Sequence, residues 1–224
     1  ELLSYTAGVI SVTMVFFLYL LVFKSSPFKM LPFTPQDGQG LNPLLQNPMM
    51  VFHPPALYLG FVGFTVPFAF AIAALMTGRL DERWLKSIRR WTLFSWLFLT
   101  IGNILGMQWA YVELGWGGYW AWDPVENSSL MPWFTGTAFL HSIIVQERKG
   151  VLKRWTISLV ALTFALTIFG TFVTRSGLIS SVHAFGVSDL GPLFLGFLAL
   201  IIITSTVLLI KRAPMLEGKK EIGT

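Results

Sequence analysis

Six apolar runs constrain this chain more than any other feature of its sequence. Each approaches the length of about 20 helical residues that crosses a hydrocarbon core. Of the 224 residues, 54% are hydrophobic and only 12% are charged, which is too apolar for a soluble fold of this length. The runs lie near residues 5–23, 57–76, 91–111, 130–146, 155–174 and 192–210. We predict an all-α, polytopic membrane helix bundle with about six transmembrane helices, forming a single domain over residues 1–224.

The first run is expected to be a true span rather than a cleaved signal peptide. It has no basic start, and no small-residue cleavage site precedes the next segment. The chain also begins at Glu1 and opens almost directly into this span. We therefore expect it to be a piece of a longer protein.

The 16 Lys and Arg residues predict the orientation of the bundle, because cationic residues flanking the spans are retained on the cytoplasmic side. Five lie in segment 77–90, four in segment 147–154 and four in the tail from residue 211. Both termini would then be cytoplasmic, and the net charge of +5 reports topology. Nucleic acid is not an expected partner, since the basic residues lie at span ends without a binding fold. The stretches expected to face outward are 24–56, 112–129 and 175–191.

Cysteine is absent from the sequence. The chain therefore offers no disulfide, no thiolate metal ligand and no cysteine nucleophile. Any thiol chemistry must use the sulfur of a partner.

The first outward stretch is rich in proline but turns apolar again over residues 41–52. We expect this part to lie along the membrane surface or to re-enter the membrane. It ends in His53, followed by Pro54 and Pro55, which restrict the backbone where the second span is expected to begin. A histidine at this place would be held firmly.

The second outward stretch belongs to a segment, residues 109–133, that contains five tryptophans. Interfacial anchoring explains isolated tryptophans at span ends, but this density exceeds what an aromatic belt requires. Interleaved glycines would let the backbone approach a flat group closely. Asp123 and Glu126 stand where a helix begins, so helix capping is favoured over a role in polarising the site or in contacting a partner.

Only three histidines are present, His53, His141 and His183. His141 would lie roughly 16 Å along its helix, so it should face the bundle interior, either hydrogen-bonded to a Ser or Thr or bound to a metal. His53 and His183 flank the tryptophan-rich segment. They are either solvated loop residues or axial ligands on opposite sides of a planar haem, since no carboxylate cluster indicates zinc.

The run WGGYWAWDPVENSSLMPW resembles the WWD signature of haem-handling membrane proteins. The resemblance extends to LNPLLQNPMMVFHPPALYLGFVGF, TGTAFLHS and GTFVTRSGLISSVHAF. On these motifs the chain is identified as a member of the CcmF-type family of cytochrome c haem lyase subunits, as a fragment of the full-length chain. A related family devoted to nitrite reductase maturation shares the motifs, so the resemblance does not separate the two.

The resemblance implies two haem sites. In the outer, periplasmic site, His53 and His183 would bind the iron of transient substrate haem. His141 would bind a transmembrane haem b, the electron donor, whose second ligand lies outside this chain. Further residues that the resemblance places around the outer haem are Trp116, Tyr119, Trp120, Trp122, Asp123 and Arg175, the last paired with a propionate.

The resemblance also implies partners and a location. The haem chaperone CcmE would deliver haem, CcmH would bind the apocytochrome, and CXXCH thiols of apocytochrome c would form thioethers at the bacterial inner membrane. Two other classes of function stay open. One is a haem transporter with His141 at its midplane, and the other is a non-catalytic scaffold of the haem lyase complex.

Overall fold

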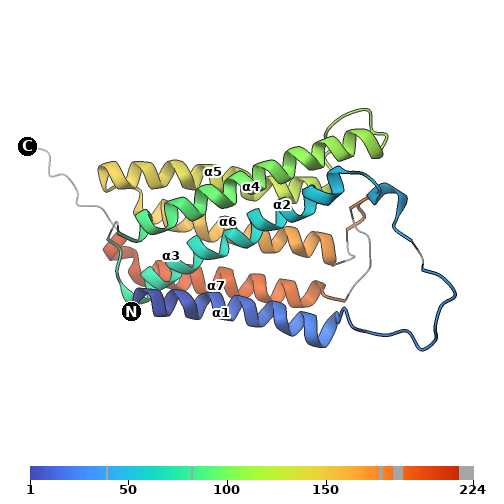
Figure 1. Ribbon diagram of the computed structural model, residues 1–224. Coiled ribbons are helices and arrows are strands. Elements are labelled where there is room, and N and C mark those ends of the chain that lie inside the picture. The colour runs from blue at the N-terminus through green and yellow to red at the C-terminus, as the bar shows by residue number, and fades with distance from the viewer. Residues whose placement is uncertain (39, 82, 177–178, 184–188, 217–224) are drawn as a thin grey trace, which may run out of the picture.

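The computed structural model describes residues 1–38, 40–81, 83–176, 179–183 and 189–216, and every regular element within them is a helix (Figure 1). The α-helices are α1 (Leu2–Tyr19), α2 (Met49–Gly63), α3 (Thr65–Thr77), α4 (Arg83–Glu113), α5 (Pro124–Lys149), α6 (Lys153–Arg175) and α7 (Gly191–Leu216). A π-helical turn, Leu20–Lys24, continues α1, and a 3-10 turn, Pro43–Leu45, precedes α2. The prediction of an all-α membrane helix bundle is confirmed.

Among the described residues, five segments are long and apolar enough to cross a membrane, where about six were expected. These are Leu2–Lys24, Met49–Thr77, Trp84–Glu113, Lys153–Arg175 and Gly191–Leu216. The expected span 130–146 lies in α5, which runs along the bundle and packs on α4 and α6 (Figure 1). Hydroxyl residues, Pro132 and His141 dilute the hydropathy of α5, which explains why it falls short by composition.

The second span begins earlier than the sequence indicated. Helix α2 begins at Met49, whose N–H donates to the Asn47 side chain, and a break at Phe64 separates α2 from α3. His53 therefore lies inside a helix, with Pro54 and Pro55 following it in the same helix. The expected surface segment 41–52 instead divides into the turn Pro43–Leu45 and the first turn of α2.

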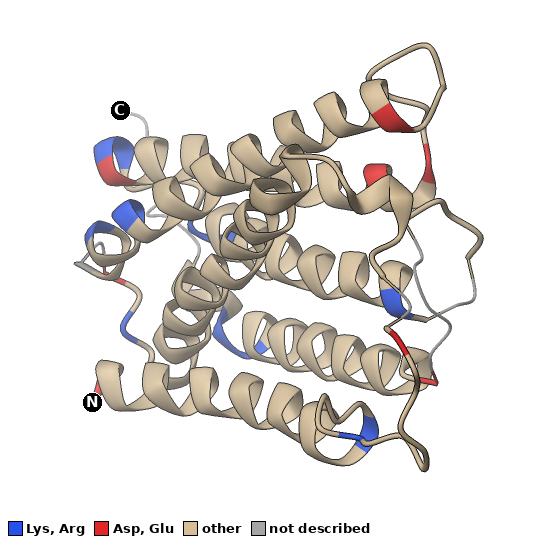
Figure 2. Cartoon of the chain, turned by 45° about the vertical axis from the view of Figure 1, so that its right-hand side comes forward, with Lys and Arg blue, Asp and Glu red and all other residues tan. Residues whose placement is uncertain are grey.

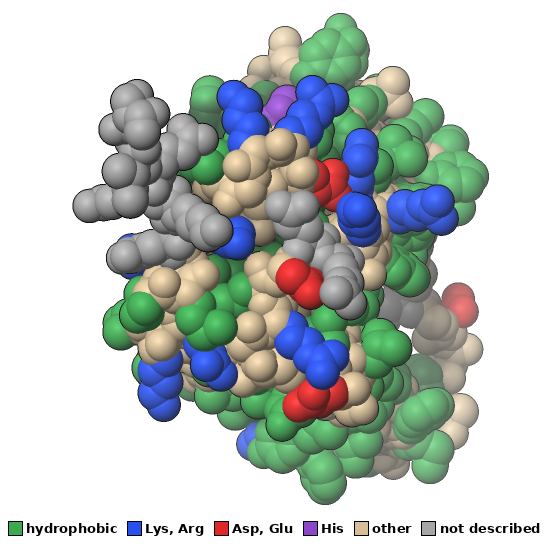
Figure 3. Space-filling view, turned by 90° about the vertical axis from the view of Figure 1, so that its left-hand side faces the viewer, with side chains coloured by type: hydrophobic (Ala, Val, Ile, Leu, Met, Phe, Trp, Pro, Cys, Tyr) green, Lys and Arg blue, Asp and Glu red, His purple; other side chains and the backbone are tan. Residues whose placement is uncertain are grey.

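Basic residues and outward loops occupy opposite ends of the bundle. Most Lys and Arg lie at the end where α1 begins and α7 ends, while the connections before α2, after α4 and after α6 lie at the other end (Figures 1 and 2). Seen end-on in Figure 3, cationic side chains gather on the first of these ends. This separation is the one that the cation count predicted. Lys219 and Lys220, which belong to that count, lie outside the described residues.

Arg212 joins α7 to the end of α3. Its Nε donates to the carbonyl of Leu75 at 2.8 Å, and its Nη2 donates to that of Met76 at 3.0 Å. Both carbonyls belong to the last turn of α3, where no intrahelical donor remains. The cation thus satisfies this helix end and interacts favourably with the negative end of its dipole.

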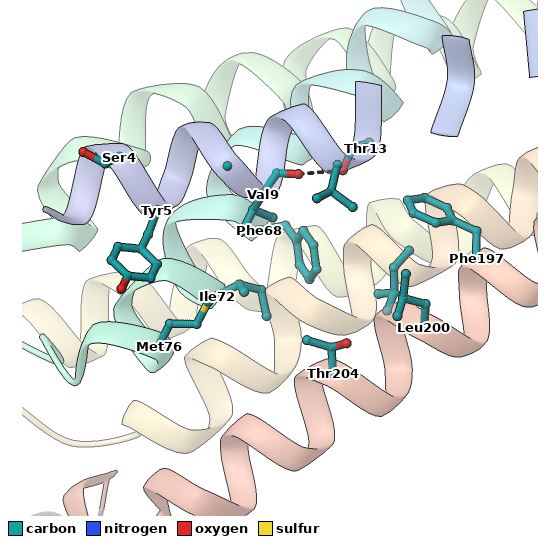
Figure 4. A pocket seen from close by; sticks show the side chains of 13 residues that line it. Ser4, Tyr5, Val9, Thr13, Phe68, Ile72, Met76, Phe197, Leu200 and Thr204 are labelled. Atoms are coloured by element: carbon teal, nitrogen blue, oxygen red, sulfur yellow. Dashed lines mark hydrogen bonds between the residues drawn. The ribbon is translucent and has the colours of Figure 1, made fainter. Parts of the chain in front are cut away.

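A cavity of about 520 Å³ opens between α1, α3 and α7 (Figure 4). Its lining is almost entirely apolar, and its hydroxyls include that of Thr13, which already donates to Val9. The lining contains no histidine and no charged side chain.

Candidate functional site

His53 and His183, which are 130 positions apart in sequence, line the same cavity. Its volume is about 290 Å³, at the lower end of the range for small-molecule sites. Trp109 and Arg175 contribute to the same lining. A second, smaller pocket of about 40 Å³ is also lined by both histidines, together with Trp120. The structure therefore brings the two imidazoles of the outward face together.

Glycines at the crossing of α2 and α4 position this cavity. A Cβ added at Gly60 would lie 2.7 Å from the backbone N of Leu99, and one added at Gly102 would lie 2.7 Å from that of Leu57. One of these glycines is on α2 and faces the α4 backbone, and the other is on α4 and faces the α2 backbone. The two helix backbones are therefore in direct contact, with no side chain between them. Any side chain here would push α2 away from α4, and His53 would move with α2.

Replacing Gly102 by leucine should lower the free energy of unfolding by about 3 kcal/mol, because the added side chain overpacks against the α2 backbone. Chemical denaturation in detergent would measure this change. Gly196→Leu is the matched control, since no atom lies within 4 Å of a Cβ placed at Gly196, which is also in a helix. Equal unfolding free energies for the two variants would show that α2 and α4 separate without cost.

The imidazole of His53 is held on one nitrogen and enclosed on one side. Its Nδ1 donates to the carbonyl of Gly102 at 2.7 Å. Gly106, one turn further along α4, leaves room for the ring, because a Cβ there would lie 2.6 Å from Cε1 of His53. With the proton on Nδ1, the lone pair of Nε2 is free to bind a metal.

The imidazole of His183 has a different partner. Its Nδ1 lies 3.0 Å from the carboxylate of Asp123, and the Ser181 hydroxyl donates to the same carboxylate at 2.7 Å. The ring also lies beside Trp109 and Trp116, with centroids separated by 5.2 and 6.3 Å. His183 is therefore not the solvated loop histidine that was one of the two open readings.

Asp123 is also the N-cap of α5, as expected. Its carboxylate accepts from the N–H of Val125 at 2.9 Å, and Glu126 completes a capping box by accepting from the N–H of Asp123 at 3.2 Å. Glu126 accepts a second bond from the N–H of Ala121 at 3.0 Å. Its burial raises the pKa of the Glu126 carboxyl above the ordinary value, although these two bonds oppose the rise. The structure therefore confirms the prediction that Asp123 and Glu126 cap this helix.

The aromatic residues of the WWD segment divide into two sets. Trp116 and Trp120 are partly buried, the first beside His183 and the second in the lining of the smaller pocket. Tyr119 is 54% exposed and stacks on Tyr111, with ring centroids 4.5 Å apart. Trp122 is 74% exposed. The two sets adjoin, because the rings of Trp120 and Trp122 meet edge to face with centroids 6.4 Å apart. That all four rings contact one haem stays a prediction.

Trp122 adopts an unusual backbone conformation, with φ at 60°. A bulky residue in the left-handed region is strained, and such strain concentrates at functional sites. The side-chain amide of Asn127 donates to the Trp122 carbonyl at 2.9 Å and stabilises this conformation. The indole is thereby held out into the surroundings.

Two features of the site were missed from sequence. Trp109 is fully buried, and its indole N–H donates to the carbonyl of Leu44 at 2.7 Å, while Asn47 donates to Glu113 at 2.8 Å. These bonds join the segment before α2 to the end of α4. The glycines of α4 are the other feature, and their spacing of four residues on an apolar helix was the available signal.

His141 does not lie where it was expected. It was predicted to face the bundle interior, but it is exposed on α5, in line with Met131, Phe134 and Ala138. These positions recur every three or four residues, so they form one outer stripe of the helix. The physical reason is that α4 and α6 already cover the other faces of α5.

The donor chemistry of the outer pair fits haem iron. Each imidazole has its Nδ1 occupied by a protein acceptor, which leaves Nε2 as the ligand atom and fixes the ring orientation. In the part of the chain that the structure describes, no group of three or more His, Cys, Asp or Glu could hold a metal ion. His53 and His183 are thus two imidazoles that would hold haem iron, rather than part of a larger cluster of metal ligands among the described residues.

Comparisons with known proteins show which family the chain resembles. The family model described as cytochrome C assembly protein matches residues 2–180. The chain is 53% identical to the cytochrome c-type biogenesis protein CcmF of Pseudomonas aeruginosa over 205 residues, covering 91% of this chain and 31% of that protein. It is 50% identical to the biogenesis protein NrfE of Haemophilus influenzae over 173 residues, covering 77% of this chain and 27% of that protein.

A solved structure, described as cytochrome c heme lyase CcmF, matches with a TM-score of 0.77 and 41% identity. The match covers 93% of this chain and 31% of that one. The chain thus spans about a third of the length of the relatives it matches. From its sequence and its helical arrangement, the chain belongs to the cytochrome c assembly protein family.

Proposed function

We propose that this chain forms the outward haem-holding site of a cytochrome c haem lyase subunit, an enzyme that acts in a complex during cytochrome c maturation. One observation carries the proposal: His53 and His183 line a single cavity, each with Nδ1 on a protein acceptor and Nε2 left for iron. The membership of the family supports it.

The charge distribution supports a location in the bacterial inner membrane with the site on the periplasmic face. Cationic residues are retained on the cytoplasmic side, and most of them lie at the end opposite the WWD segment (Figure 2). Haem captured at the outward end would meet apocytochrome c after its export. The free CXXCH thiols of that substrate would be available on the same side.

In the proposed site, His53 and His183 bind the iron of the substrate haem. Trp116 and Trp120 contact the macrocycle from the buried side, and Tyr119 and Trp122 extend the aromatic surface beyond the cavity. At 290 Å³ the cavity is small, so the macrocycle would lie partly outside it, on the side of the WWD segment. Arg175, at the last turn of α6 and in the cavity lining, pairs with a propionate.

The proposed reaction joins haem to apocytochrome c. The chaperone CcmE delivers haem, and CcmH presents the CXXCH segment. Each cysteine thiol adds across a vinyl group, so a carbon–sulfur bond forms, the vinyl double bond is consumed and the thiol hydrogen passes to the other vinyl carbon. The role of the two histidines is to hold the ring still, so that both vinyl groups face the incoming thiols.

His141 is proposed as one of the residues that would hold a transmembrane haem b, a group that would supply electrons to the outer site. Its exposure on α5 supports a site completed from outside this chain. The relatives are about three times as long, so a second ligand can come from a segment beyond this one. The transporter alternative requires His141 to line a pathway inside the bundle, and its exposed position gives that alternative less support.

Haem analysis of the full-length polypeptide tests the proposal. We expect purified wild type to retain haem at two sites, the double variant His53→Ala with His183→Ala to keep only the haem b, and His141→Ala to keep only the outer haem. Pyridine haemochrome assays would give the amounts. Wild-type protein that carries no haem after mild extraction would instead favour the scaffold. If the double variant at His53 and His183 lost all of its haem, including the haem assigned to His141, the proposal of two separate sites would be contradicted.

A further inference from the structure

The carboxylate of Asp123 is the meeting point of three donors. One of its oxygens, Oδ2, accepts from the N–H of Val125 at 2.9 Å, the hydroxyl of Ser181 at 2.7 Å and Nδ1 of His183 at 3.0 Å. Ser181 also accepts from the backbone N–H of His183 at 3.0 Å. The network therefore joins the WWD motif to a loop about 60 residues away.

Capping of α5 does not account for this arrangement. A cap needs only the bond to Val125, whereas Ser181 and His183 lie between α6 and α7 and belong to neither helix. The side chains of His183 and Asp123 are 14% and 10% exposed, so water competes little for their hydrogen bond. A charge-assisted bond in such surroundings specifies where the ring lies.

The two proposed ligands are thus held by unlike acceptors. The Nδ1 of His53 donates to a neutral carbonyl, and that of His183 faces a carboxylate. A carboxylate partner keeps the proton on Nδ1 and raises the basicity of the imidazole at Nε2. His183 would then be the stronger donor to iron.

We infer that Asp123 is a positioning residue for His183: it fixes the tautomer, orientation and donor strength of this ligand, and it does not itself touch haem. The inference rests on the proposed function, because it concerns the outer haem site. It gives the acidic residue of the WWD motif a role through the second histidine, beyond starting the following helix.

Asparagine is the informative replacement at this position. Asn is as good an N-cap as Asp, so Asp123→Asn should keep the start of α5. Because the same oxygen accepts from Val125 and from His183, an Asn that keeps the cap offers His183 a neutral amide oxygen, and the charge that raises the basicity of Nε2 is lost. Asp123→Ser, also a good cap, has a shorter side chain and removes the acceptor of His183 altogether. Glu126→Gln preserves the capping box and serves as the matched control.

The measurements are outer haem occupancy, the reduction potential of that haem and the thermal unfolding midpoint of the full-length protein. In Asp123→Asn we expect about a 10-fold loss of haem affinity at the outer site. We also expect a raised potential for the haem that remains and an unchanged midpoint. Asp123→Ser should lose at least as much, because His183 then has no acceptor at this position, and Glu126→Gln should match wild type. Combining Asp123→Asn with His183→Ala should add no further loss, because both act on one ligand.

The outcomes separate this inference from the proposed function. If His183→Ala loses outer haem while Asp123→Asn keeps both wild-type occupancy and wild-type potential, Asp123 only caps α5 and the inference is wrong. Additive losses in the double variant would also overturn it. If His183→Ala itself retains outer haem, the proposed ligand pair fails, and the inference fails with it.

Discussion

Alanine at either His53 or His183 is expected to lower the yield of holocytochrome c by about 100-fold or more in cells that depend on the full-length protein. Loss of a residue that merely supports a metal ligand lowers affinity or activity about 10- to 100-fold, and loss of the ligand itself should exceed this. Haem staining of cytochrome c in membrane fractions would give the yield. The protein level, measured in the same fractions, would show whether the variant accumulates.

His53→Ala and His183→Ala should lower the holocytochrome yield to a similar extent, although the two histidines lie in different parts of the fold. One ring lies inside α2 and the other in the connection between α6 and α7. Glu113→Gln is a useful control, because its amide oxygen can still accept the bond from Asn47 while no proposed haem contact is altered. A holocytochrome yield above one-tenth of wild type for either alanine variant would exclude that histidine as an essential ligand.

Gly106→Ala is expected to be nearly as damaging, although it adds a single methyl group. That methyl would lie 2.6 Å from Cε1 and 3.0 Å from Nδ1 of His53, so the ring must move. Because Nδ1 also donates to Gly102, a shift of the ring strains this bond and carries Nε2 away from the iron. A misplacement of about 1 Å in a reacting group can cost about 100-fold in rate.

Outer haem occupancy and holocytochrome yield would both register this change. Gly196→Ala is the matched control, since it lies in α7 with no atom within 4 Å of the added carbon, and it should behave as wild type. Wild-type occupancy in Gly106→Ala would mean that His53 accepts another position without losing the iron. That result would contradict the confined setting described for the ring.

Apolar periodicity and length were enough to predict the helices, but not where each begins. The Pro54–Pro55 step suggested a helix start, whereas α2 begins at Met49 and contains both prolines. In this case tertiary contacts outweigh local preference, because α2 packs closely on α4 through Gly60 and Gly102. The sixth expected span corresponds to α5, which is helical through its length, although polar residues dilute its hydropathy.

The site was predictable as a set of residues but not as a geometry. His53 and His183 were grouped by the family resemblance and by their place on the outward face, and they do share a cavity. The capping role of Asp123 followed from its place before Pro124, while its bond to His183 joins residues 60 positions apart and has no local signal. The direction in which His141 faces depends on packing between helices, which hydropathy does not encode.

The shared carboxylate has a consequence for the order of biosynthesis. During translation His53 is synthesised first, Asp123 next and His183 last. His183 can therefore bind its partner, the Asp123 carboxylate, only after the start of α5 has been made. A nascent polypeptide that has not passed residue 183 offers a single imidazole. Under the proposed function, such an incomplete protein would hold only one of the two ligands, so it would capture haem more weakly than the finished site.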